Sequence, residues 1–138
     1  MTSATRDIEA ILRRHLSEEG GIRLALLFGS AARGRLRPDS DLDVGIWPVD
    51  PEMPLSDELA LAATLGRATG REIDIVRLDR ASALVRFEVA KRHTVLRAEP
   101  AESLPRFLAS AALEHAELGP LWEDARRRLA KRLARAGS

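Results

Sequence analysis

The sequence has no cysteine, no tyrosine and few aromatic residues, with two tryptophans and three phenylalanines among 138 residues. Without cysteine there can be no disulfide or thiolate metal site, which suits a reducing cytoplasm. No apolar run approaches the roughly 20 residues of a membrane-spanning helix, and the N-terminal segment lacks a signal-peptide core. With 22 basic and 21 acidic residues the net charge is +1. We therefore expect a soluble cytoplasmic protein that binds neither membranes nor nucleic acid directly.

The remaining composition is that of a folded globular domain, with 45% hydrophobic and 31% charged residues. At this length we expect one domain over 1–138, divided into a core over 1–100 and C-terminal helices over 101–138. Apolar spacing predicts alternating helices and strands. In chain order these are a helix near 8–16, strands at 22–28 and 42–46, a helix over 55–68, a strand at 72–76, a helix over 81–92, a short strand at 94–96, and helices from 101 with a break at Gly119-Pro120. This pattern predicts an α/β (α+β) fold with a small mixed β-sheet flanked by helices.

Two aspartates, Asp41 and Asp43, are separated by one residue where the strand at 42–46 begins. Side chains at positions i and i+2 of a strand point to the same face, so both carboxylates can reach one place. Carboxylates held together repel each other unless a cation or protons lie between them. Oxygen ligands favour a hard divalent ion such as Mg²⁺. The pattern is common, and two solvated aspartates on an outer strand face would look the same.

Gly29 and Ser30 follow the preceding strand, at 22–28. A glycine lets the backbone approach a ligand closely, and Ser30 can begin a helical turn whose free N–H groups favour an anion. Phosphate at this turn and metal at the two aspartates would be complementary parts of one site. A plain turn capped by Ser30 accounts for the same residues and does not exclude that role.

A third carboxylate, Asp74, interrupts the otherwise apolar segment 73–76. A charge within a short strand is costly if it is buried without a partner. If this strand lies beside the strand of Asp43, Asp74 joins the same cluster, and three convergent aspartates can hold two metal ions. An edge strand with one polar face would show the same pattern, so Asp74 alone decides little.

Taken together, these residues resemble the signature of the DNA polymerase β-like nucleotidyltransferase superfamily. That signature is Gly-Ser, a spacer, Asp-x-Asp and a later third carboxylate; here ten residues separate Ser30 from Asp41. The short chain and Ala32-Arg33-Gly34 look most like its minimal nucleotidyltransferase (MNT) branch. Segment 74–89 and the helical tail are similar to that branch too, so the resemblance covers most of the chain.

The resemblance implies a metal-dependent enzyme whose catalytic core is 1–100. MNT proteins are often encoded beside a HEPN ribonuclease and pair with it as antitoxin and toxin. The implied reaction transfers AMP from ATP to a hydroxyl of the HEPN toxin, commonly of a tyrosine, and silences it. The implied partner is therefore a HEPN toxin in a hetero-oligomer. The preference for ATP rests on the resemblance alone.

Applied residue by residue, the resemblance implies that Gly29 and Ser30 bind the triphosphate. Asp41 and Asp43 would ligate Mg²⁺, as two ions. Asp74 would complete the metal site and help to deprotonate the incoming hydroxyl. Two alternatives stay open: transfer to a small molecule or an RNA, and an antitoxin that acts by binding alone.

Several weaker features have a structural and a functional interpretation. Arg33 can bind phosphate oxygens or belong to a solvated basic turn. The basic residues of 126–135 can form the solvated face of an amphipathic helix, contact nucleic acid or dock a toxin. Trp47 and Trp122 are candidates for core packing first and for partner contact second.

Overall fold

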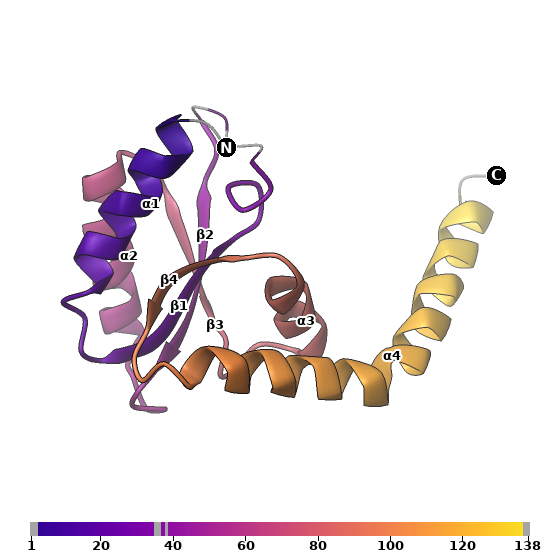
Figure 1. Ribbon diagram of the computed structural model, residues 1–138. Coiled ribbons are helices and arrows are strands. Elements are labelled where there is room, and N and C mark those ends of the chain that lie inside the picture. Colours follow the sequence, from indigo (N-terminus) through magenta and orange to yellow (C-terminus); the bar gives the residue numbers. More distant parts are fainter. Residues whose placement is uncertain (1–2, 35–36, 38, 137–138) are drawn as a thin grey trace.

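The computed structural model describes residues 3–34, 37 and 39–136 (Figure 1). Its elements are α1 (Ser3–Leu16), β1 (Ile22–Phe28), β2 (Leu42–Pro48), α2 (Leu55–Thr69), β3 (Ile73–Arg77), α3 (Ala83–Lys91), β4 (Thr94–Ala98) and α4 (Ser103–Ala136). Up to β4, the order and type of these elements are those that the apolar spacing predicts. Among these described residues, no helix is both long and apolar enough to cross a membrane.

The predicted break at Gly119-Pro120 is wrong, because α4 continues through both residues. Proline has no N–H to donate to the carbonyl four residues earlier, and its ring crowds that carbonyl. Both effects can bend a helix without ending it. Figure 1 shows α4 bending partway along its length, so that its yellow second half leaves the body of the protein.

The four strands form one mixed sheet in the order β3-β2-β1-β4. β1 pairs antiparallel with both β2 and β4, whereas β2 and β3 pair in parallel. A parallel pair needs a crossover connection, and α2 supplies it. The predicted small mixed sheet flanked by helices is thereby confirmed.

Each face of the sheet is covered by two helices. Strand alternation sends Leu42, Val44 and Ile46 of β2 to a core shared with α1 and α2. The other face packs against α3 and α4, and its buried residues are Leu24, Leu26, Leu78, Val89 and Phe107. Asp43 and Trp47 of β2 belong to this second face by the same alternation.

Trp47 packs against the second core, as predicted for a structural tryptophan. The guanidinium of Arg86 lies 5.5 Å from the centroid of the Trp47 ring. Arg86 also donates to the carbonyl oxygen of Leu78 at 2.8 Å and to Glu114 of α4 at 2.9 Å. These contacts join α4 to the end of β3. The side chain of Trp122 lies outside the part that the structure describes.

A buried ion cluster joins β3 to α2. Arg77, 8% exposed, donates to Glu58 at 2.8 Å and to Asp79 at 2.7 Å. Its guanidinium also donates to the carbonyl oxygens of Met53 and Pro51, each at 3.2 Å. The hydrogen bond to Asp79 is the main reason that the pKa of Arg77 is raised above its usual value. This cluster fixes the outer strand of the sheet.

Candidate active site

The parallel pairing of β2 and β3 places Asp43 directly opposite Asp74. By strand alternation both residues lie on the face of the sheet that α3 and α4 partly cover. Asp74 was expected to join the other two aspartates only if its strand lay beside the strand of Asp43. The two strands are neighbours in the sheet. Asp41 lies just before β2, so all three aspartates belong to one end of two adjacent strands.

Asp43 is partly buried, whereas Asp41 and Asp74 are exposed. Burial raises the pKa of the Asp43 carboxyl above its ordinary value of 3.8, and the negative charges of Asp74 and then Asp41 raise it further. The three aspartates therefore interact electrostatically and oppose one another's charge. A set of carboxylate oxygens with this repulsion suits a hard divalent cation.

Gly29 makes room for Asp43. Its φ of +74° lies in the left-handed region, which disfavours residues with a Cβ. A Cβ built on Gly29 would overlap the carboxylate of Asp43. The preceding residue, Phe28, is the register partner of Asp43 across β1 and β2. The glycine thus lets an aspartate pack against the backbone, a role distinct from the ligand approach that the sequence suggests.

Residues 29–34 form a hydrogen-bonded turn, where the sequence suggests a helical turn. The backbone N–H of Arg33 donates to the carbonyls of both Gly29 and Ser30, at 3.2 Å each. The side chain of Arg33 is exposed and Ser30 is half-buried. The turn therefore begins at Gly29, beside the Asp43 carboxylate.

Arg71 positions the loop that leads into Asp41, a role that the sequence does not reveal. Its guanidinium donates to the carbonyl oxygens of Ser40, at 3.1 Å, and Arg37. Ser40 in turn accepts from the backbone N–H of Arg37 at 2.9 Å. The partners of Arg71 are 31 and 34 residues away in the sequence, so no local pattern marks them.

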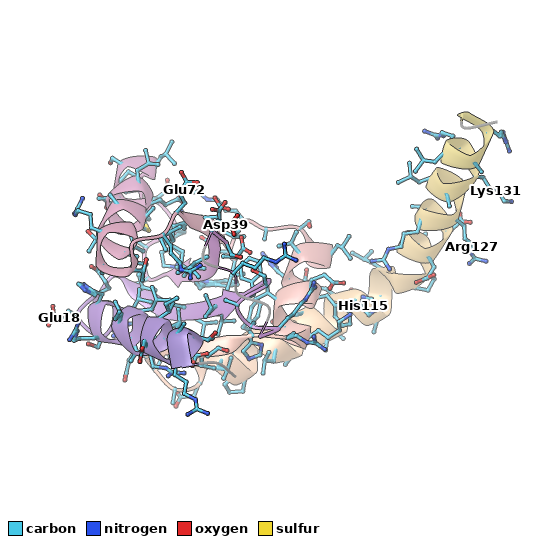
Figure 2. The ribbon with its side chains drawn as sticks, turned by 90° about the horizontal axis from the view of Figure 1, so that it is seen from above. Glu18, Asp39, Glu72, His115, Arg127 and Lys131 are labelled. Carbon is cyan, nitrogen blue, oxygen red and sulfur yellow. The ribbon has the colours of Figure 1, made fainter. Side chains whose placement is uncertain are left out.

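The site is an open surface at the edge of the sheet. Figure 2 shows Asp39 and Glu72 near each other at this edge, where the Leu42 N–H donates to the Glu72 carbonyl at 2.9 Å. Within 3–34, 37 and 39–136, no three His, Cys, Asp or Glu side chains are arranged as a ready-made metal site. Two cavities, of about 320 and 490 Å³, have linings that include none of the three aspartates. A metal would thus have to draw these carboxylates together.

Residues 8–100 match the family model described as "Polymerase beta, Nucleotidyltransferase". The matched segment includes the Gly29-Ser30 turn and all three aspartates, and it spans more than half of the chain. The protein therefore belongs to the polymerase beta nucleotidyltransferase family.

Several solved structures share this fold. A toxin–antitoxin with AMP-PNP has 21% identity and a TM-score of 0.66, over 86% of this chain and 98% of that one. The complex of a tri-AMPylated Shewanella oneidensis HEPN toxin with its MNT antitoxin has 17% identity and a TM-score of 0.59, over 86% and 98%. A protein assigned as a minimal nucleotidyltransferase has 31% identity and a TM-score of 0.52, over 64% and 88%. No match was found among curated proteins.

Proposed function

We propose that this protein is a Mg²⁺-dependent antitoxin that transfers AMP from ATP to a tyrosine hydroxyl of a HEPN ribonuclease toxin and so neutralises it. The observation that carries the proposal is the pairing of Asp43 with Asp74, beside Asp41 and against Gly29. The acceptor is supported by the likeness to a toxin–antitoxin with AMP-PNP and to a complex that holds a tri-AMPylated HEPN toxin.

The three aspartates fit the metal that the family implies. Asp41 and Asp43 would hold Mg²⁺, as two ions, with Asp74 completing the ligand set. Bound Mg²⁺ would supply positive charge that offsets the mutual repulsion of the carboxylates and the charge of the triphosphate. Burial is the main reason that the pKa of Asp43 is raised, and the negative charges of Asp74 and Asp41 raise it further.

The remaining steps belong to the protein's own groups. The turn at 29–34 would bind the triphosphate, with Ser30 and the exposed Arg33 as donors to its oxygens. Asp74 would accept the proton of the acceptor hydroxyl. The hydroxyl oxygen then bonds to the α-phosphorus, whose bond to the bridging β-phosphate oxygen breaks, and pyrophosphate leaves. Because the β2–β3 register fixes the backbone positions of Asp43 and Asp74 before substrate binds, catalysis would come chiefly from positioning and electrostatics.

A labelling assay tests the proposal. The protein is incubated with Mg²⁺, the product of the adjacent gene and ATP labelled at the α-phosphate. We expect stable label on the acceptor protein, and none when ATP is labelled only at the γ-phosphate. Asp43→Asn and Asp74→Asn should each abolish transfer. Asp39→Asn is the matched control, because Asp39 lies at the same edge but outside the group of three aspartates, and it should transfer normally.

The outcomes separate the alternatives. Complete neutralisation of the toxin by Asp43→Asn, with no label transferred, would contradict the enzymatic proposal and favour an antitoxin that acts by binding. Label that appears on a small molecule or an RNA, with none on the protein, would support a nucleotidyltransferase with a different acceptor. Replacing the labelled tyrosine of the acceptor by phenylalanine should remove the label if the hydroxyl is the nucleophile.

A further inference from the structure

One apolar stripe runs along the whole of α4, but only its first half is covered. Leu104, Phe107, Leu108 and Ala111 pack against the core shared with α3. Helical spacing continues the same stripe into the projecting half, which we call the tail (residues 117–136). The tail residues of the stripe are Leu118, Leu121, Leu129 and Leu133, exposed by 38%, 64%, 56% and 65%.

The stripe keeps to one side of the tail. Leu118 and Leu129 are eleven residues apart, as are Trp122 and Leu133. An eleven-residue spacing stays close to the true helical period, so the stripe follows the helix with little supercoiling. Figure 2 shows Arg127 and Lys131 pointing away from the body of the protein. The apolar stripe lies on the opposite face of the helix and therefore on the inner side of the bend.

The charges of the tail are separated along its length. Residues 117–124 contain three acidic and no basic residues, and residues 125–135 contain six basic and no acidic residues. Two tails side by side in the same direction would place like charges together. Two tails in opposite directions would place the acidic part of each against the basic part of the other. The tail is thus complementary to an antiparallel copy of itself.

We infer that the tails of two copies of this chain pair in antiparallel orientation and form a homodimer. The pairing would set Leu118 of one copy beside Leu133 of the other, with Ala125 of both copies at the crossing point. The small side chain of Ala125 lets the helices approach closely there. Apolar contact along the stripe would provide most of the stability, because exposed ion pairs contribute little.

The same register also aligns the flanking charges. On one flank of the stripe, Glu117 of one copy would lie near Lys131 and Arg135 of the other. On that flank Asp124, which pairs with Arg128 within its own helix, would also reach Arg128 of the second copy. Such flanking charges select the orientation of paired helices more than they stabilise the pair.

The length of the tail is a second reason to expect a partner. Twenty helical residues extend about 30 Å, and in proteins most of the stability of a helix comes from packing of its apolar face. Figure 1 shows the tail projecting away from the sheet and the other helices. A second copy would bury the stripe and would thereby stabilise the helix.

Sedimentation equilibrium of the purified chain tests the inference. We expect a dimer that dissociates on dilution, and Leu129→Glu should be a monomer at concentrations where the unaltered protein is dimeric. Leu113→Glu is the matched control: Leu113 is 63% exposed on the same helix but lies on the opposite face from the stripe. It should dimerise normally. Circular dichroism of both variants checks that the domain remains folded.

Disulfide trapping tests the orientation, and the absence of native cysteine makes it unambiguous. Ala125→Cys should cross-link to itself. Leu118→Cys should cross-link to Leu133→Cys when the two variants are mixed, and neither should cross-link to itself. Self-linking of Leu118→Cys would show a parallel pair and overturn the inference.

A strictly monomeric unaltered protein would also overturn it. The stripe would then have to be assigned to another occupant, such as the toxin, and Leu129→Glu would weaken a hetero-complex in place of a homodimer. The inference does not rest on nucleotidyl transfer. A dimer of the unaltered chain that lacks transferase activity would refute the proposed function and leave the tail pairing intact.

Discussion

Strand β3 contributes one residue to each of two clusters of charged side chains, and the two clusters differ in composition. One contains only carboxylates, and the other contains an arginine with two carboxylates. On one face, Asp74 lies opposite Asp43, and burial together with the negative charges of Asp74 and Asp41 raises the pKa of Asp43. On the other face, three residues further on, Arg77 is buried between Glu58 and Asp79 and hydrogen-bonds both. In the second cluster both carboxylates have a cationic partner in Arg77. For the first cluster we propose a cation from solution.

The difference predicts that the Arg77 cluster stabilises the fold and that the aspartate group serves the proposed chemistry. A buried arginine with both carboxylates in place fixes β3 against α2, and the removal of one partner leaves charges that are buried and unpaired. Carboxylates gathered without a counter-charge destabilise a protein slightly, and such groups are often found at functional sites. Substitutions in the two clusters should therefore separate activity from stability.

Asp43→Asn should have the largest effect. It removes the central carboxylate of the aspartate group, and we expect adenylyl transfer to fall by about a thousandfold or more, as for the loss of a principal electrostatic contribution to a transition state. Stability of the metal-free protein should not decrease. Initial rates with labelled ATP, together with urea denaturation, measure both quantities. A variant that loses activity only because it unfolds would refute the assignment of Asp43 to the chemistry.

Arg77→Met should give the reverse pattern. The variant leaves Glu58 and Asp79 buried without their partner, and we expect a loss of about 3–5 kcal/mol in the free energy of unfolding. Transfer by the folded fraction should change little. Arg80→Met is the matched control, since Arg80 is exposed and donates to the same Pro51 carbonyl; it should cost less than about 0.5 kcal/mol. Equal losses in the two variants would show that the ion cluster adds no stability.

Gly29→Ala tests the contact between the turn and the aspartate group. A Cβ at this position would displace the Asp43 carboxylate, and a displaced catalytic group lowers the rate by about a hundredfold. Gly34→Ala separates this effect from backbone strain. Gly34 has a φ of +70°, close to the +74° of Gly29, but a Cβ there meets nothing within 4 Å. Both variants should lose about 1–2 kcal/mol of stability, and only Gly29→Ala should lose activity.

The fold was largely predictable from apolar spacing, and the reason is visible in the elements. The strand β1 is a short apolar run, β2 alternates apolar with other residues, and α2 is followed by Gly70 in the left-handed conformation. The course of α4 through Pro120 was not predictable in this way. A proline ends a helix or merely bends it according to what surrounds it, and the exposed tail can bend freely.

Asp41 and Asp43 were singled out by their spacing, because they lie two residues apart where β2 begins. The neighbouring position of Asp74 depends on a parallel pairing that only the fold shows. Arg71 and Arg77 were missed, since their partners come from distant segments. The roles of Ser30 and Arg33 in binding phosphate, and the division into 1–100 and 101–138, stay predictions.

The smallest expected effect is a dependence of stability on pH that Mg²⁺ should abolish. The pKa of Asp43 is raised in the folded protein, above its ordinary value of 3.8. The folded state therefore binds this proton more tightly than the unfolded state, and stability falls as pH rises from 3.8 through the folded-state pKa. Near pH 7 in EDTA, Asp43→Asn should melt at a slightly higher temperature than the unaltered protein.

That difference should vanish at acid pH, where Asp43 is protonated in both states, and it should reverse when Mg²⁺ is added at pH 7. The reversal is expected because a cation that binds the folded state stabilises it, and the variant has lost its central ligand. Melting curves of the two proteins across pH, with and without Mg²⁺, give the measurement. If Mg²⁺ raised both melting temperatures equally, the carboxylate group on β2 and β3 would not be the metal site, and its repulsion would need another explanation.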